Sequence, residues 1–208
     1  MRYDLHCHTQ YSTCSLLSPA IFLRMITKKM DGIAVTDHDT LDGYYAIKKL
    51  NKNRDFEIIK AVEKNTTNGH LLAYYINSVP KSNDFFEAVD SFKSQGALLA
   101  IAHPFSYVGK HKFRFDRNAL RKIDALECRN ASMSEKQNSR AVDMAGRYRI
   151  AKIGGSDSHF VAEVGLSYTI FDGNLRTAIK KRKTSVGGTL KYFVLNQMAS
   201  MILHQVRK

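Results

Sequence analysis

The chain has 208 residues, of which 44% are hydrophobic and 25% charged. This composition is typical of one globular domain, or of two very small ones, and it excludes an intrinsically disordered chain. Lysine and arginine outnumber aspartate and glutamate by 32 to 19, and the net charge of +13 favours partners that carry phosphate.

Three features indicate a single cytoplasmic domain covering residues 1–208. No run of 18 or more apolar residues occurs, so we expect no membrane span. The sequence begins without the basic and apolar regions of a signal peptide and contains no Gly/Ser-rich or Pro-rich linker. The three cysteines, Cys7, Cys14 and Cys128, form no Cys-x-x-Cys pair, so we expect neither a disulfide scaffold nor a zinc ribbon.

Short apolar segments alternate with segments of helical periodicity along the chain. Strands are predicted at 3–5, 32–35, 56–62, 70–76, 97–102, 123–127, 150–153 and 168–171. Helices are predicted at 19–29, 41–51, 84–95, 134–149 and 174–182. The alternation predicts an α/β fold with a largely parallel sheet, either open and doubly wound or closed into a barrel.

Histidines and carboxylates gather where the predicted strands end. His6 and His8 are two residues apart on one strand, so both imidazoles face the same side and suit one metal ion. Six of the eight histidines lie beside a strand end or an acidic residue: His6, His8, His38, His70, His103 and His159. Glu63 and Asp157 add carboxylates that can bridge two ions. The barrel would bring these side chains together at one rim, whereas an open sheet would spread them out.

Five segments in this order resemble the motifs of the PHP (polymerase and histidinol phosphatase) superfamily: 4–9 (DLHCHT), 33–38 (IAVTDH), Glu63, 101–104 (IAHP) and 155–159 (GSDSH). The resemblance spans roughly residues 3 to 170. It implies a distorted, TIM-like (β/α)7 barrel with two or three metal ions at the C-terminal rim of the strands. Residues 171–208 would then be a helical extension packed on the barrel.

Carried over position by position, the resemblance implies the metal ligands. His6, His8, Glu63 and Asp157 would hold one ion, with Glu63 bridging to a second ion that His70 and His103 complete. His38 and His159 would hold a third. The ions would be Mn, Zn or Fe, which such His-rich sites with carboxylates accept.

One further ligand of the family is absent from its expected place. Thr13 occupies the position where many members have Asp or His. Cys14 could supply a thiolate if the loop register shifts by one residue. The alternative is that Cys14 is a small buried side chain.

Paired ions suit phosphate ester hydrolysis, because they activate water and stabilise the leaving oxygen. No Gly-x-Ser-x-Gly elbow or P-loop is present, so covalent serine catalysis and nucleotide switching have little support. Asp37 and Asp39 would orient ligands or assist proton transfer, and His159 or His38 would protonate the leaving group. Asp39 could instead be the N-cap of the helix that follows.

Basic residues supply candidate phosphate contacts. Lys110, Lys112, Arg114 and Arg117 follow His103 in a loop interleaved with aromatic residues, and that loop should border the metal rim. The alternative is a solvated loop with its aromatic rings folded inward. Arg129 and Lys64 are further candidates. The basic run 180–183 is interpreted as a solvated face.

The sequence thus predicts a metal-dependent phosphoesterase acting on a nucleotide or a nucleic-acid end. One alternative is a phosphatase for another small phosphomonoester, and a second is a non-catalytic metal-binding module in a nucleic-acid complex. Apolar residues from 190 to 206 share one helical face, which would pack on the barrel or, alternatively, mediate dimerisation or membrane-surface contact.

Overall fold

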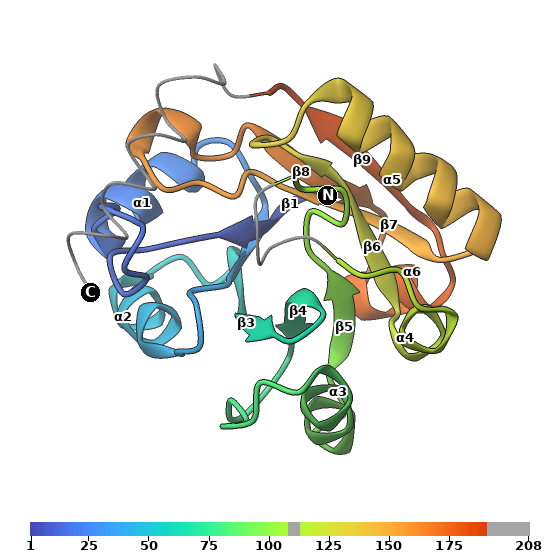
Figure 1. Cartoon of the computed structure of the whole chain (residues 1–208). Coiled ribbons are helices and arrows are strands. Elements are labelled where there is room, and N and C mark those ends of the chain that lie inside the picture. Colours follow the sequence, from blue (N-terminus) through green and yellow to red (C-terminus); the bar gives the residue numbers. More distant parts are fainter. Residues whose placement is uncertain (108–112, 191–208) are drawn as a thin grey trace.

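The computed structural model describes residues 1–107 and 113–190, which form a mixed α/β fold built on one sheet (Figure 1). The strands are β1 (Arg2–Cys7), β2 (Gly32–Val35), β3 (Glu57–Thr66), β4 (Gly69–Tyr74), β5 (Leu98–Ile101), β6 (Ala125–Asn130), β7 (Ala151–Gly155), β8 (Ser167–Phe171) and β9 (Thr184–Gly188). Their order in the sheet is β7-β6-β5-β4-β3-β2-β1-β8-β9.

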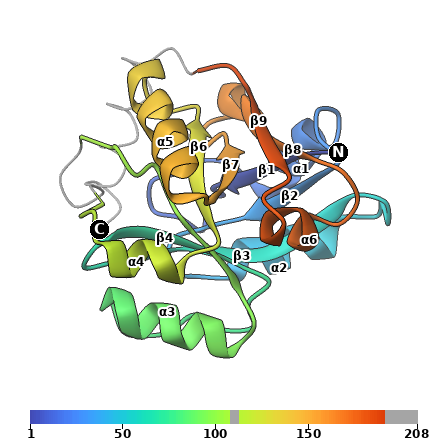
Figure 2. The ribbon, with the colours of Figure 1, turned by 90° about the vertical axis from the view of Figure 1, so that its right-hand side faces the viewer.

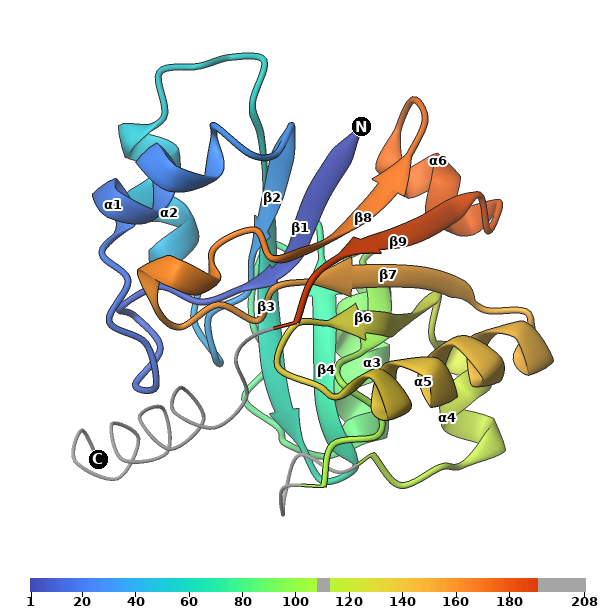
Figure 3. The ribbon, with the colours of Figure 1, turned by 90° about the horizontal axis from the view of Figure 1, so that it is seen from above.

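The sheet curls until β7 lies against β1 and β8, as the view from above shows (Figure 3). Thr169 Oγ1 in β8 donates to the carbonyl of Gly154 at 2.9 Å and accepts from its N–H at 2.8 Å. A Cβ atom on Gly155 would lie 2.4 Å from the backbone nitrogen of His6, so only glycine permits this approach of β7 to β1. The nearly closed sheet confirms the barrel and rejects the open sheet.

The prediction of a largely parallel sheet is wrong. The strand triplets β1–β2–β3 and β5–β6–β7 are parallel, but β3–β4, β4–β5, β1–β8 and β8–β9 are antiparallel. The cause at β3–β4 is the connection from Thr66 to Gly69, which is too short for the crossover that a parallel pair needs. The sheet has nine strands, and the count of seven is not confirmed.

Helices surround the sheet, and all but α4 begin within one residue of the predicted starts. They are α1 (Pro19–Ile26), α2 (Asp42–Leu50), α3 (Phe85–Ser94), α4 (Arg117–Lys122), α5 (Glu135–Tyr148) and α6 (Leu175–Lys180), with a short 3-10 turn, η2 (Val161–Glu163). The side chains of Ser18, Asp84, Asp116, Ser134 and Asn174 accept backbone N–H groups of the first turns of α1, α3, α4, α5 and α6. Among the described residues, no helix is long and apolar enough to cross a membrane.

Two elements differ from the predictions. The short helix α4 occupies part of the expected basic loop. Strand β9 lies within the predicted helical extension 171–208; it is polar and half-exposed, so its sequence carries no burial pattern. The helix predicted at 190–206 falls almost wholly outside the described residues.

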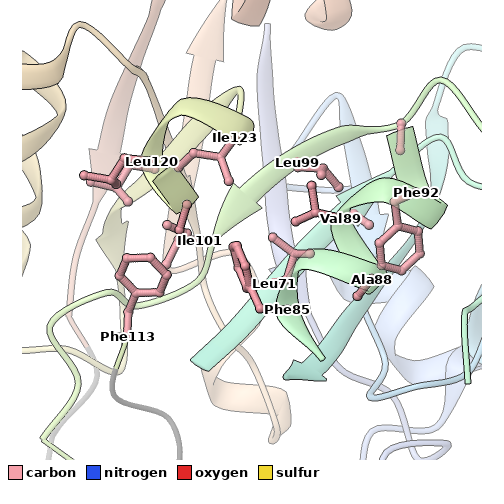
Figure 4. Close-up of a cluster of buried hydrophobic side chains, with 14 of the residues drawn as sticks. Leu71, Phe85, Ala88, Val89, Phe92, Leu99, Ile101, Phe113, Leu120 and Ile123 are labelled. Carbon is pink, nitrogen blue, oxygen red and sulfur yellow. The ribbon is translucent and has the colours of Figure 1, made fainter. Parts of the chain in front are cut away.

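The largest buried cluster fixes α3 and α4 against the outer face of β4 and β5 (Figures 2 and 4). Phe85 and Phe92 of α3 pack with Leu71, Leu99 and Ile101 of the two strands. Another cluster places Cys7 beneath α1 and α2, so Cys7 faces away from its two flanking histidines. The packing holds the strand ends rigidly around the rim where the motifs meet.

Candidate metal centre

Glu63 is the centre of the rim cluster. It is 1% exposed and contacts five imidazoles. Its Oε2 atom lies 3.2 Å from His6 Nε2, 3.2 Å from His8 Nε2 and 3.3 Å from His38 Nδ1. Its Oε1 atom lies 2.7 Å from His70 Nδ1 and 3.0 Å from His103 Nε2. The two oxygens of one carboxylate therefore face two different sets of ring nitrogens, which is the arrangement of a bridging ligand.

Four donor atoms outline a tetrahedron beside Glu63. His6 Nε2 and His8 Nε2 are 3.2 Å apart, and each lies 3.2 Å from Glu63 Oε2. Asp157 Oδ1 lies 3.5 Å from His6 Nε2 and 3.3 Å from His8 Nε2. Five of the six edges are thus 3.2 to 3.5 Å, and a regular tetrahedron with edges of about 3.3 Å has its centre about 2.0 Å from each corner, which is the length of zinc bonds to nitrogen and oxygen. The donor set therefore fits a divalent transition metal ion.

Buried hydrogen bonds set the tautomers of the first two histidines. His6 Nδ1 lies 2.9 Å from Glu127 Oε1, and an ionised carboxylate can only accept, so His6 carries its proton on Nδ1. Ser12 Oγ donates to Asp37 at 2.7 Å, and is therefore the acceptor for His8 Nδ1 at 3.1 Å. In the neutral rings, both Nε2 atoms would carry lone pairs directed at the tetrahedron, as a metal site requires.

The charges of the cluster depend on one another. Burial opposes ionisation of Glu63, but the imidazoles of His6, His38 and His70 outweigh it and hold the pKa of Glu63 well below its usual range. Burial opposes the charge of His6 as well, yet the carboxylates of Glu127 and Glu63 raise its pKa well above the ordinary value. The carboxylates thus stabilise positive charge among the imidazoles, supplied either by protons or by metal ions.

Cys14 rather than Thr13 joins the cluster. One donor atom each of His8, Cys14 and His38 lie within 4.8 Å of one another, and Cys14 is buried. Burial lowers the pKa of His38 well below its ordinary value, which favours the neutral form of the ring that binds metal. Its buried Nδ1 atom has no hydrogen-bond partner among the described residues and points at Glu63 Oε2. Cys14 is thus close enough to be a candidate ligand, and it is also the small buried side chain of the other alternative.

The other predicted residues occupy varied places. The ring of His159 packs against that of His8 at 4.6 Å, and its Nδ1 lies 2.8 Å from the carbonyl oxygen of Asp157. Asp37 is fully buried and accepts from Thr9 N, Thr9 Oγ1 and Ser12 Oγ, each at 2.7 Å, which favours its role in orienting ligands.

Asp39 is not the N-cap of α2. Leu41 holds that position without a side-chain hydrogen bond, and Asp39 has a left-handed backbone with φ of 55°. Its carboxylate binds Lys64 Nζ at 2.8 Å and Asn65 Nδ2 at 2.6 Å. Lys64 Nζ also donates to Asn83 at 2.6 Å, so the amine of this lysine is bound to other side chains of the protein.

Two of the predicted phosphate contacts, Arg129 and Lys64, are bound to other groups of the protein. Arg129 Nη1 pairs with both oxygens of Glu135 at 2.8 and 2.7 Å, while its Nη2 donates to the carbonyl of Gly188. Arg114 is exposed, and its backbone N–H binds Asn68. Lys110 and Lys112 lie outside the described residues. Phe105 and Phe113 are buried, as the inward-folded alternative predicted, whereas Tyr107 and Phe115 are exposed.

The sequence did not reveal the buried residues that hydrogen-bond to the candidate ligands or to the segments that carry them. Glu127 Oε2 accepts the backbone N–H of His103 at 2.6 Å, so this carboxylate fixes two candidate ligands at once. Asp4 accepts from the backbone N–H of Ser156 at 2.8 Å and ties β1 to the loop that carries Asp157. Burial raises the pKa of Asp4 to about 6, partly offset by its bonds to Ser156. Glu127 is the last residue of the strand predicted at 123–127, and the candidate ligands also lie at the ends of predicted strands. This position was the feature of the sequence that could have identified Glu127 as part of the site.

Fold and rim together define an α/β barrel whose strand ends carry clusters of His, Glu, Asp and Cys side chains that could hold metal. The chain belongs to the PHP family: the family model described as the PHP domain matches residues 4–132. A second model, described as PHP-associated, matches residues 135–184 and contains Asp157 and His159.

Several known proteins are similar to this chain. The uncharacterized protein MJ0417 of Methanocaldococcus jannaschii is 31% identical over 178 residues, which are 82% of this chain and 70% of that protein. A two-domain protein from Bacteroides vulgatus, containing a predicted PHP-like metal-dependent phosphoesterase, superposes with a TM-score of 0.78 at 16% identity. The match covers 91% of this chain but only 65% of that one. PsfC from Pseudomonas syringae superposes with a TM-score of 0.65 at 20% identity, covering 99% and 97% of the two chains.

Proposed function

We propose that this protein hydrolyses a phosphate ester of a nucleotide or a nucleic-acid end with a metal-activated water. The observation that carries the proposal is the tetrahedron of donor atoms from His6, His8, Glu63 and Asp157, five of whose six edges have lengths that suit bonds of about 2.0 Å to a divalent transition metal. Membership of the PHP family supports the same chemistry.

Glu63 would bridge two ions, because its two oxygens face separate groups of imidazoles. His6, His8 and Asp157 would complete one site on the Oε2 side, and His70 and His103 the second on the Oε1 side. When bound, paired divalent ions lower the pKa of water and stabilise the charge of a leaving oxygen.

A third ion would be held by His38 and His159, with Cys14 as an additional sulfur ligand. Cys14 and His38 lie together within 4.8 Å, and His38 and His159 both pack against the ring of His8, at 4.7 and 4.6 Å. A thiolate prefers zinc, iron or cobalt over magnesium. This site would therefore be more selective than the two sites that use only nitrogen and oxygen donors.

The chain's own residues would divide the remaining work. Asp37 and Glu127 orient His8 and His6 through the bonds described above, and both are positioning residues. His159 is partly exposed at the rim, with 13% of its side chain accessible, and can hold a proton for the leaving group where it does not bind metal. The excess positive charge of the chain raises the local concentration of phosphorylated substrates.

The test is hydrolysis of bis-(p-nitrophenyl) phosphate and p-nitrophenyl phosphate by the metal-reconstituted protein and by its His8→Ala and Asp157→Ala variants. We expect turnover in the wild type and a loss of at least about 100-fold in both variants, because each removes a corner of the tetrahedron. Glu135→Ala is the control, since Glu135 pairs only with Arg129.

The choice of ester separates the candidate functions. Cleavage of the diester supports action on nucleic-acid ends, and cleavage of the monoester alone supports a small-molecule phosphatase. Metal binding without cleavage of either ester would overturn the proposed hydrolysis and leave a metal-binding module.

A further inference from the structure

A second surface feature lies away from the metal centre. A groove of about 490 Å³ runs between α4, the end of α5 and the end of α6, which lie on one side of the molecule in Figure 1. Its charged and aromatic lining residues are Arg117, Arg121, Asp124, Tyr148, Arg149, Lys180 and Arg182. Its apolar lining residues are Leu120, Ile123, Ile150 and Ile179.

The groove is at the opposite end of the strands from the metal ligands. Asp124 and Ile150 line it, and each directly precedes the first residue of a strand, β6 and β7 respectively. The candidate ligands His103 and Asp157 follow the last residues of β5 and β7. A ligand in the groove would therefore occupy a separate site.

The groove gathers positive charge that the protein does not neutralise. Five cationic side chains line it against a single carboxylate, Asp124, which is already bound to Lys93 Nζ and to the backbone N–H of Leu99. The side chains of Arg117, Arg121, Arg149 and Lys180 make no hydrogen bond or ion pair within residues 1–107 and 113–190. Such a surface attracts a ligand with several negative charges.

Two of the arginines that line the groove have strained backbone conformations. Arg149 and Arg182 have left-handed backbones with φ of 53° and 56°, in turns after α5 and α6 where glycine is the usual residue. A left-handed residue other than glycine costs about 1 kcal/mol. Arg149 and Arg182 are not needed to stabilise the helix dipoles. Arg147 already places a cation in the last turn of α5, and Lys180 does so in α6.

The floor of the groove indicates which group the ligand carries besides its negative charges. Ile123 and Ile179 are buried beneath it, and the ring of Tyr148 is 39% exposed at its edge. An apolar floor and an aromatic ring suit a nucleobase, while surrounding arginines suit phosphates. We propose that this groove binds the phosphodiester backbone of a single-stranded nucleic acid, with a base against Tyr148, independently of the metal centre.

The experiment measures binding of a fluorescein-labelled 12-nucleotide RNA by anisotropy, over a range of salt concentrations and in EDTA so that catalysis plays no part. The variant Arg117→Gln/Arg121→Gln removes two charges from the groove. The matched control, Lys48→Gln/Lys49→Gln, removes two exposed charges from α2 and leaves the same net charge. Thermal unfolding of each variant checks that the fold is retained.

Losing two phosphate contacts should reduce the slope of log affinity against log salt by about 1.4, which is roughly a 25-fold loss at 0.1 M salt. The control should bind as the wild type does. Equal losses in the two variants, or no binding by the wild type, would overturn the proposal. Displacement of the RNA by AMP at equal phosphate concentration would also overturn it, in favour of a mononucleotide site. Asp157→Ala should bind RNA normally, which separates this result from failure of the proposed hydrolysis.

Discussion

At the scale of single residues, the rim is organised by buried carboxylates that do not themselves form the tetrahedron. Glu127 and Asp37 are both buried, and each fixes one histidine. Glu127 Oε1 lies 2.9 Å from His6 Nδ1, whereas Asp37 acts on His8 through the hydroxyl of Ser12. Such outer contacts typically change metal affinity 10- to 100-fold when they are removed.

Replacement of Glu127 by glutamine tests this outer contact. The amide cannot accept from both His6 and the backbone of His103 with the strength of a carboxylate, so we expect zinc affinity to fall by about 10- to 100-fold. Titration against a chromophoric zinc chelator gives the dissociation constant. Glu135→Gln is the matched control and should leave it unchanged. Equal affinities of Glu127→Gln and the wild type would show that Glu127 does not support the site.

Replacement of Cys14 by serine tests the sulfur ligand. Protein loaded with Co²⁺ should show the near-ultraviolet charge-transfer band of a cobalt–thiolate bond, and Cys14→Ser should lose it. Cys128→Ser is the control, because Cys128 is buried in the outer core and its Sγ contacts the carbonyl oxygen of Ala141. A band that survives in Cys14→Ser but disappears in Cys128→Ser would refute the assignment.

Residue spacing predicted the convergence of the histidines but could not predict loop geometry. His6, His8, Glu63 and Asp157 follow from strand periodicity and motif order, because strand ends meet at one rim. The loop after His8 has no periodicity, so whether Thr13 or Cys14 faces inward was undetermined. The hydrogen bond from Arg129 to the carbonyl of Gly188 was unpredictable for a similar reason, since Gly188 belongs to β9, which the sequence does not reveal.

At the scale of elements, the start of α2 presses directly on the buried network behind the rim. A Cβ atom on Gly43 would lie 1.8 Å from Asp37 Oδ2 and 2.6 Å from Thr9 Oγ1. The helix therefore requires glycine here for space and not for its backbone angles. Strand directions were harder to predict than helix starts, because caps are local signals whereas β4 and β8 pair antiparallel through contacts distant in sequence.

Two glycine-to-alanine substitutions in helices should have opposite effects. Gly43→Ala should lower the free energy of unfolding by about 1–3 kcal/mol, because the methyl group displaces Asp37. Gly146→Ala in α5, where a Cβ meets nothing within 4 Å, should raise it by about 0.5–1 kcal/mol. Urea denaturation measures both values. Stabilisation by both substitutions would mean that Asp37 is not tightly enclosed.

At the scale of the whole molecule, the donor set draws together segments from distant parts of the chain. The candidate ligands come from β1, from the end of β2, from β3 and β4, and from the ends of β5 and β7, which also closes the barrel against β1. An ion bound to these segments stabilises the folded state, because the unfolded chain offers no such site.

Removal of metal should therefore lower thermal stability. A site filled at 100 times its dissociation constant contributes about 2.7 kcal/mol, which corresponds to about 5–10 °C in Tm for a chain of this length. Calorimetry of the protein before and after treatment with EDTA, and again after zinc is restored, measures the shift. Asp157→Asn should show a much smaller response. An unchanged Tm across all three states would contradict metal binding at the rim.

The most direct test of the central claim is elemental analysis of protein reconstituted with zinc and freed of excess metal by gel filtration, comparing wild type with Glu63→Gln. Because Glu63 faces both groups of imidazoles, the account predicts at least two ions per chain in the wild type and fewer than one in the variant. Equal metal content in the two proteins, or none in the wild type, would contradict it.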